Sequence, residues 1–165
     1  MSSDHSPTPA PAGGRPPPRL PPLAVAPLAG VVAWLAARAA PSLGFEFQGR
    51  TLLALLLAVA AAAIGLAGVL EFRRARTTVN PLQPGRASSL VTGGIYRHTR
   101  NPMYVAVATL LLAWALWLGN ALAPLGAVVF VAWMDRLQIP PEERALGSLF
   151  GAEFERYCRE VRRWL

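Results

Sequence analysis

Long apolar runs alternate with short arginine-bearing segments along the chain. The clearest run, residues 51–70, carries no charge and has the length of about 20 residues that a helix needs to cross the core of a bilayer. Three further runs cover residues 23–37, 101–118 and 121 to about 138. The pattern therefore predicts an all-α integral membrane protein with four transmembrane helices.

Turn residues between the apolar runs indicate how these helices connect. Gly119 and Asn120 predict a tight, uncharged turn, so the third and fourth helices are expected to form a helical hairpin. The first run is slightly short for a crossing, and Arg38 is expected to snorkel to complete it. Pro140 and Pro141 are expected to break the fourth helix.

The second run carries a face of small residues, Ala61, Gly65 and Gly68. Residues of this size let two helices approach closely within a membrane. The second helix is therefore expected to pack tightly against a neighbour on this face.

The two ends of the chain differ from the apolar middle. Residues 1–22 are rich in proline and lack apolar periodicity, which predicts a disordered tail ahead of a single membrane domain, residues 23–165. The last segment, EERALGSLFGAEFERYCREVRRWL, has apolar residues at helical spacing. Gly147 and Gly151 are expected to divide it into two short amphipathic helices on the membrane surface.

Composition supports a membrane protein. Hydrophobic residues make up 53% of the chain and the mean hydropathy is +0.36, which is too apolar for a soluble domain of this size. The net charge of +7 comes from arginine alone. The connector 71–100 is rich in arginine, so the positive-inside rule predicts that it and both termini face the cytoplasm. No nucleic-acid-binding motif accompanies the charge.

Cysteine and histidine are too few for a structural metal site, which needs about four ligands. The chain has one cysteine and two histidines, so neither an internal disulfide nor a metal site is expected. Cys158 is expected to pack or to face lipid, with palmitoylation as the alternative. His98 is expected to be a solvated loop residue, with a role as catalytic base as the alternative.

Candidate chemistry gathers in the stretch GGIYRHTRNPMY, residues 93–104. Asn101 suits an N-cap and Pro102 the first helical position, so a helix is expected to start here. Its positive end would lie beside Arg97 and Arg100, and would offer a receptor for a carboxylate or phosphate. The alternative is that both arginines are cytoplasmic anchors of a membrane helix.

A second candidate is the acidic pair Glu142 and Glu143, just after the two prolines. Both residues fall in the first turn of an expected helix, where carboxylates favour the helix dipole. They are also suited to hold an ammonium or hydroxyl group of a ligand.

Two segments, YRHTRNPMY and EERALGSLFGAEFERYCREVRRW, together resemble the isoprenylcysteine carboxyl methyltransferase and phospholipid methyltransferase superfamily of small membrane enzymes. The resemblance covers roughly residues 70–165. The matching positions, in the same order, are Gly93, Gly94, Tyr96, Arg97, Arg100, Asn101, Pro102, Tyr104, Glu142, Glu143, Phe150, Gly151 and Tyr157. Asn101 stands where the family has a histidine, and the segment ARTTVNP, residues 75–81, resembles bacterial members.

The resemblance implies an S-adenosylmethionine-dependent methyltransferase of the bacterial inner membrane, with the cofactor at the cytoplasmic mouth of the hairpin. The acceptor would be a lipophilic small molecule or a lipidated substrate that reaches the site from the bilayer. It implies catalytic roles for Arg100, Asn101 and Tyr104. The implied cofactor-binding residues are Tyr96, Arg97, Arg100, Asn101, Pro102, Tyr104, Glu142, Glu143 and Tyr157.

Asn101 cannot take up a proton near neutral pH, so it cannot replace the family histidine as a base. This favours an acceptor that is already nucleophilic, such as a carboxylate. The sequence also lacks a strand followed by a glycine-rich turn and a helix, which argues against a Rossmann-type cofactor site.

Two other readings compete with the methyltransferase. Sterol reductases share a related C-terminal design that serves NADPH, but this chain lacks their additional helices. In a non-catalytic membrane protein, the arginines would set topology, the glutamates would cap a helix and the tyrosines would be interface anchors. Cofactor binding separates the three.

Overall fold

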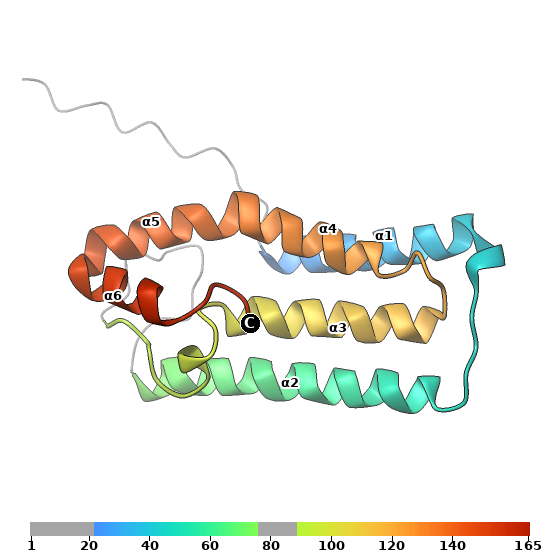
Figure 1. The fold of residues 1–165 in the computed structure, drawn as a ribbon, viewed down its shortest axis with the longest axis horizontal. Coiled ribbons are helices and arrows are strands. Elements are labelled where there is room, and N and C mark those ends of the chain that lie inside the picture. The colour runs from blue at the N-terminus through green and yellow to red at the C-terminus, as the bar shows by residue number, and fades with distance from the viewer. Residues whose placement is uncertain (1–21, 76–88) are drawn as a thin grey trace, which may run out of the picture.

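The computed structural model describes residues 22–75 and 89–165, which are helical apart from turns and one isolated bridge between Gly44 and Asn120 (Figure 1). The predicted tail, apart from residue 22, and the connector 76–88 lie outside the described residues. The α-helices are α1 (Pro22–Ala39), α2 (Arg50–Arg74), α3 (Pro102–Leu118), α4 (Leu125–Trp133), α5 (Ile139–Phe150) and α6 (Ala152–Glu160). Shorter helical turns are η1 (Pro41–Leu43), η3 (Gly94–Arg97) and η4 (Met134–Gln138).

The helices α1 to α4 lie side by side in a bundle, with α3 between α2 and the α1/α4 pair (Figure 1). The small-residue face of α2 packs against α3, because Ala61 is buried and a Cβ on Gly65 would lie 3.5 Å from Cβ of Ala106. A Cβ on Gly68 would lie 3.6 Å from Cγ of Pro102. The prediction of a close helix contact at this face is confirmed, and α3 is the partner.

A second close contact joins α1 to α4. Ala29 and Ala33 of α1 are buried at 2% and 0% exposure. A Cβ on Gly126 of α4 would collide with the carbonyl oxygen of Ala29 and would lie 2.7 Å from Cβ of Ala33. The two backbones therefore touch at Gly126, and only glycine fits there without displacement.

The outward faces of the bundle are apolar. On α2, Leu52 is 61% and Val59 67% exposed, and similar side chains line the other helices: Leu28, Val31, Leu35, Leu110, Trp117, Val128 and Val129. Among the described helices, α2 is long and apolar enough to cross a membrane, while α1 and α3 are apolar but shorter. An apolar surface of this extent is typical of a membrane protein.

The expected break at Pro140 and Pro141 is wrong. The fourth helix starts at Leu125, after a turn over residues 121–124, and continues through η4 into α5 as one helical run (Figure 1). In η4 the amide of Ile139 donates to the carbonyl of Met134, which is the wider π-helical spacing. A π turn accommodates the prolines, because it relieves the clash of a proline ring with the carbonyl four residues earlier.

The division of the last segment was predicted only in part. Gly151, at φ 50° and ψ −126°, separates α5 from α6, whereas Gly147 lies inside α5. The apolar residues Phe154 and Tyr157 of α6 pack against Tyr96. This face of α6 is therefore covered by residues of the stretch before α3.

The two ends of the bundle differ in chemistry. At one end the predicted Gly119–Asn120 turn is present, and the side-chain Nδ2 of Asn120 donates to the carbonyl of Ala40 at 2.8 Å. The start of α3, the start of α5, α6 and residues 161–164 meet at the opposite end (Figure 1). The charged residues of the two candidate stretches gather at this second end.

Candidate functional site

The start of α3 organises the polar end. The helix begins at Pro102, as predicted, and Asn101 occupies the N-cap position. The Asn101 side chain does not cap the helix, and its Nδ2 instead donates to the carbonyl of Arg163 at 3.0 Å. The amides of Tyr104 and Val105 donate to the carbonyl of Asn101 at 3.0 Å each. The free amides expected at this helix start are thus partly used by the chain itself.

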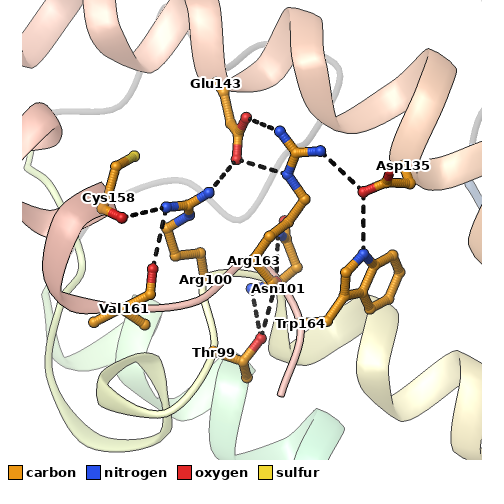
Figure 2. Close-up of polar contacts among 9 residues, drawn as sticks. All are labelled: Thr99, Arg100, Asn101, Asp135, Glu143, Cys158, Val161, Arg163 and Trp164. Atoms are coloured by element: carbon orange, nitrogen blue, oxygen red, sulfur yellow. Dashed lines mark hydrogen bonds and ion pairs between the residues drawn. The ribbon is translucent and has the colours of Figure 1, made fainter.

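Arg100 points into the interior of this end, and its side chain is only 13% exposed. Its Nη1 donates to the carbonyls of Cys158 at 2.9 Å and Val161 at 3.1 Å, and its Nη2 donates to Glu143 at 2.9 Å (Figure 2). Its Nε is buried and has no hydrogen-bond partner among the described residues. Arg100 therefore retains one unused donor inside the cluster.

Glu143 is shared by two guanidinium groups (Figure 2). Arg163 donates from Nε to Oε1 at 3.2 Å and from Nη2 to Oε2 at 2.6 Å, while Arg100 binds Oε1. Arg163 also contacts Asp135 at 2.9 Å. Hydrogen bonds to Glu143 and Asp135 raise the pKa of Arg163 above its ordinary range. The four side chains form a charge-balanced network.

Glu142 turns to different partners from its neighbour. Its Oε1 accepts hydrogen bonds from the Tyr104 hydroxyl at 2.8 Å and from Gln138 Nε2 at 2.6 Å. Gln138 is 5% exposed and Tyr104 is 8% exposed, so both donors are buried, while Glu142 itself is partly exposed. The two adjacent glutamates therefore serve two separate polar clusters, which the sequence alone left undivided.

Tyr96 and Tyr157 lie in a mainly apolar cluster under α6. The Tyr157 hydroxyl donates to the carbonyl of Tyr96 at 2.7 Å. The rings of Tyr96 and Phe72 pack edge to face, with 5.5 Å between their centroids. Burial raises the pKa of both tyrosines. These contacts give the two tyrosines a packing role beside the charged network.

The structure thus brings most of the predicted site residues to one end of the bundle, but in two sets. Arg100, Asn101 and Glu143 meet around Arg163, and Tyr104 meets Glu142. Pro102 is buried at the start of α3. In contrast, Arg97 and His98 are exposed at the end of η3 and join neither set.

Sequence reasoning missed several members of the two sets: Thr99, Asp135, Gln138, Arg163 and Trp164. Asp135, Gln138 and Glu142 are spaced as one stripe along a helix. That stripe is visible in the sequence only if the helix is allowed to continue through the two prolines. The expected break at Pro140 concealed it.

The family model described as phospholipid methyltransferase matches residues 49–153. An uncharacterized protein of Haemophilus influenzae (strain ATCC 51907 / DSM 11121 / KW20 / Rd) is 51% identical over 63 residues, which are 38% of this chain and 100% of that protein. No solved structure matches the chain. The family match includes Arg100, Tyr104 and both glutamates, and the chain belongs to the phospholipid methyltransferase family.

Proposed function

We propose that this protein transfers a methyl group from S-adenosylmethionine to a lipophilic acceptor at the cytoplasmic face of a membrane. Membership of a methyltransferase family supports the reaction class. The observation that carries the proposal is that Arg100 and Glu142 lie at the same end of an apolar bundle, where Arg100 binds Glu143 and Glu142 accepts from Tyr104. These residues supply a buried cation and a carboxylate inside the segment that the family model matches.

The side chains present fit the aminoacyl end of this cofactor. That end carries a carboxylate, which needs a donor, and an ammonium, which needs an acceptor. Arg100 has a buried Nε with no partner among the described residues, and a buried N–H in this state is uncommon unless a ligand satisfies it. Glu142 supplies an acceptor that Tyr104 and Gln138 orient. Arg100 would hold the carboxylate and Glu142 the ammonium.

When bound, the cofactor supplies an electrophilic methyl group on a sulfonium centre. The chain's own residues would then act by positioning, which can contribute about 7–11 kcal/mol when reactants are well oriented. Asn101 cannot serve as a base, since its amide cannot accept a proton near neutral pH and is bonded to the Arg163 carbonyl. His98 is exposed and outside both sets. Neither Asn101 nor His98 is thus placed as a base in the described part of the chain, which supports an acceptor that is already nucleophilic, such as a carboxylate.

We place the polar end at the cytoplasmic surface of a bacterial inner membrane, with α1 to α4 as four crossings and both termini on the cytoplasmic side. Arg73, Arg97, Arg100 and Arg136 support this orientation, since arginine is enriched on the cytoplasmic side of membrane helices. The exposed apolar side chains of the four helices support burial of the bundle in lipid. A lipophilic acceptor would then reach the site laterally from the bilayer.

Calorimetric titration of the purified, detergent-solubilised protein with S-adenosylhomocysteine tests the proposal, with NADPH as the competing ligand. We expect saturable binding of S-adenosylhomocysteine, which Glu142→Gln weakens at least tenfold. Glu153→Gln is the matched control, because Glu153 is exposed on α6. Binding of NADPH alone would favour a reductase, and binding of neither by folded protein would favour a non-catalytic role.

The acceptor is tested separately with S-adenosylmethionine carrying a labelled methyl group. The probes are detergent-solubilised N-acetyl-S-farnesylcysteine, which offers a carboxylate and no free amine, and vesicles of phosphatidylethanolamine, which offer an amine. We expect label on the carboxylate compound. Transfer to the amine alone would contradict the inference about the acceptor while leaving the methyltransferase proposal intact.

A further inference from the structure

Residues 161–164, which we call the strap, follow α6 and cross the start of α3. Their backbone carbonyls accept four hydrogen bonds from Thr99, Arg100 and Asn101. Val161 accepts from Arg100 Nη1 at 3.1 Å and Arg162 from the Arg100 amide at 2.9 Å. Arg163 accepts from Thr99 Oγ1 at 3.1 Å and from Asn101 Nδ2 at 3.0 Å. The strap is thus bonded to the residues that lead into α3.

The side chains of the strap contact the helical run that η4 and α5 form. Arg163 binds Glu143 and Asp135, and Trp164 Nε1 donates to Asp135 at 3.2 Å (Figure 2). Asp135 and Glu143 belong to the continuous helical run of η4 and α5. Figure 2 shows Arg163 lying between this run and Asn101. Arg163 therefore connects the residues that lead into α3 with this helical run.

The division of Glu143 between two arginines has a consequence for Arg100. Arg163 contributes two N–H groups to Glu143, one to each carboxylate oxygen, whereas Arg100 contributes one. A carboxylate and a guanidinium otherwise tend to pair through two parallel hydrogen bonds. Without Arg163, the second oxygen of Glu143 would be open to the unpartnered Nε of Arg100. Arg163 thus keeps Glu143 from saturating Arg100.

We propose that Arg163 is a positioning residue for the cofactor site. It occupies Glu143 and so keeps the Nε donor of Arg100 available to the carboxylate of the ligand. This inference rests on the proposed function, since it assumes that Arg100 receives the aminoacyl carboxylate. It assigns Arg163 no contact with the ligand. The strap would therefore tune affinity for the aminoacyl end without changing recognition of the nucleoside.

The test compares two probes in calorimetric titrations of the full chain: S-adenosylhomocysteine, which has the aminoacyl carboxylate, and methylthioadenosine, which lacks it. Arg163→Gln should weaken binding of the first about tenfold, equivalent to roughly 1.4 kcal/mol. It should leave binding of the second within twofold of wild type. A general structural defect would weaken both. Arg162→Gln is the matched control, since its side chain is exposed, and it should bind both probes as wild type does.

Two more variants keep the inference falsifiable. Adding Glu143→Gln to Arg163→Gln should raise S-adenosylhomocysteine affinity again, at least threefold. The reason is that residue 143 then lacks the charged carboxylate that would bind the Nε of Arg100. Arg163→Lys should lose less than Arg163→Gln, and it provides the comparison if the glutamine variant fails to fold. Equal S-adenosylhomocysteine binding by wild type and folded Arg163 variants would overturn the inference alone. Absence of binding by wild type would overturn the proposed function with it.

Discussion

The Tyr104 hydroxyl donates a 2.8 Å hydrogen bond to Glu142 Oε1, which joins the first turn of α3 to the first turn of α5. These turns are 38 residues apart in sequence. Both side chains belong to the segment that the phospholipid methyltransferase family model matches. The contact therefore links the two family motifs at one point in space, and it orients the carboxylate proposed to receive the ligand's ammonium.

Tyr104→Phe removes this donor and nothing else from the ring. A hydrogen bond to a charged group contributes about 1.5–3 kcal/mol, so we expect S-adenosylhomocysteine affinity to fall about tenfold or more while the helices persist. Calorimetry and circular dichroism measure the two effects. Thr109→Val is the control, because it removes an α3 hydroxyl that donates within its own helix, to the carbonyl of Val105. Wild-type affinity in Tyr104→Phe would show that this contact does not orient the site.

Tyr157→Phe should act on stability. The substitution leaves the buried Tyr96 carbonyl without the 2.7 Å hydrogen bond it receives from Tyr157. An unsatisfied buried carbonyl costs about 1–3 kcal/mol, so the midpoint of thermal unfolding in detergent should fall by several degrees. Tyr96→Phe is the comparison, since it retains the carbonyl and its bond. An equal loss in both variants would mean that removal of either hydroxyl, and not loss of this particular hydrogen bond, accounts for the change.

The sequence predicted the parts of the fold that local signals determine. The start of α3 was found from Pro102, and its end from Gly119, which adopts the left-handed conformation at φ 61°. The apolar run 51–70 located α2, although the helix extends from Arg50 to Arg74. That extension was missed because charged residues end an apolar pattern without ending a helix.

The relationships that build the site were not predictable in the same way. The helix continues through Pro140 and Pro141 by way of the π turn at η4, and no residue pattern in the sequence predicts that turn. Arg163 meets Glu143 and Asp135 across 20 and 28 residues of sequence. Such pairings depend on where the whole chain folds, so the sequence indicated Glu143 as a site residue but neither Arg163 nor Asp135.

Gly126→Val should separate α1 from α4. Even the Cβ of an added side chain would collide with the Ala29 carbonyl oxygen, and the α1 backbone cannot move away as a flexible side chain would. We expect a lower thermal midpoint and faster proteolysis in detergent. Gly30→Ala is the matched control, because a Cβ there would meet its nearest neighbour, Leu111 Cδ2, at an ordinary 3.9 Å. Equal stability of the two variants would show that the close contact between α1 and α4 at Gly126 can be lost without destabilising the protein.

Cys158 should react slowly with alkylating agents. The thiol packs against the cluster of Tyr96, Phe154 and Tyr157, and burial raises its pKa despite the opposing influence of Arg100. Only the thiolate is nucleophilic, so a raised pKa leaves less of the reactive form at pH 8 than in a free cysteine, for which the pKa is about 8.5.

The rate constant for iodoacetamide, followed by mass spectrometry, should therefore lie at least threefold below that of free cysteine at pH 8. Between pH 8 and 9 it should still rise more steeply than the rate for free cysteine, which levels off there. If burial only blocked access of the reagent to the thiol, the rate would be lower, but the pH at which it levels off would be the same as for free cysteine. A rate that levels off below pH 8.5 would mean that Arg100 outweighs burial at this thiol, and would make Cys158 a better candidate for modification than its packing indicates.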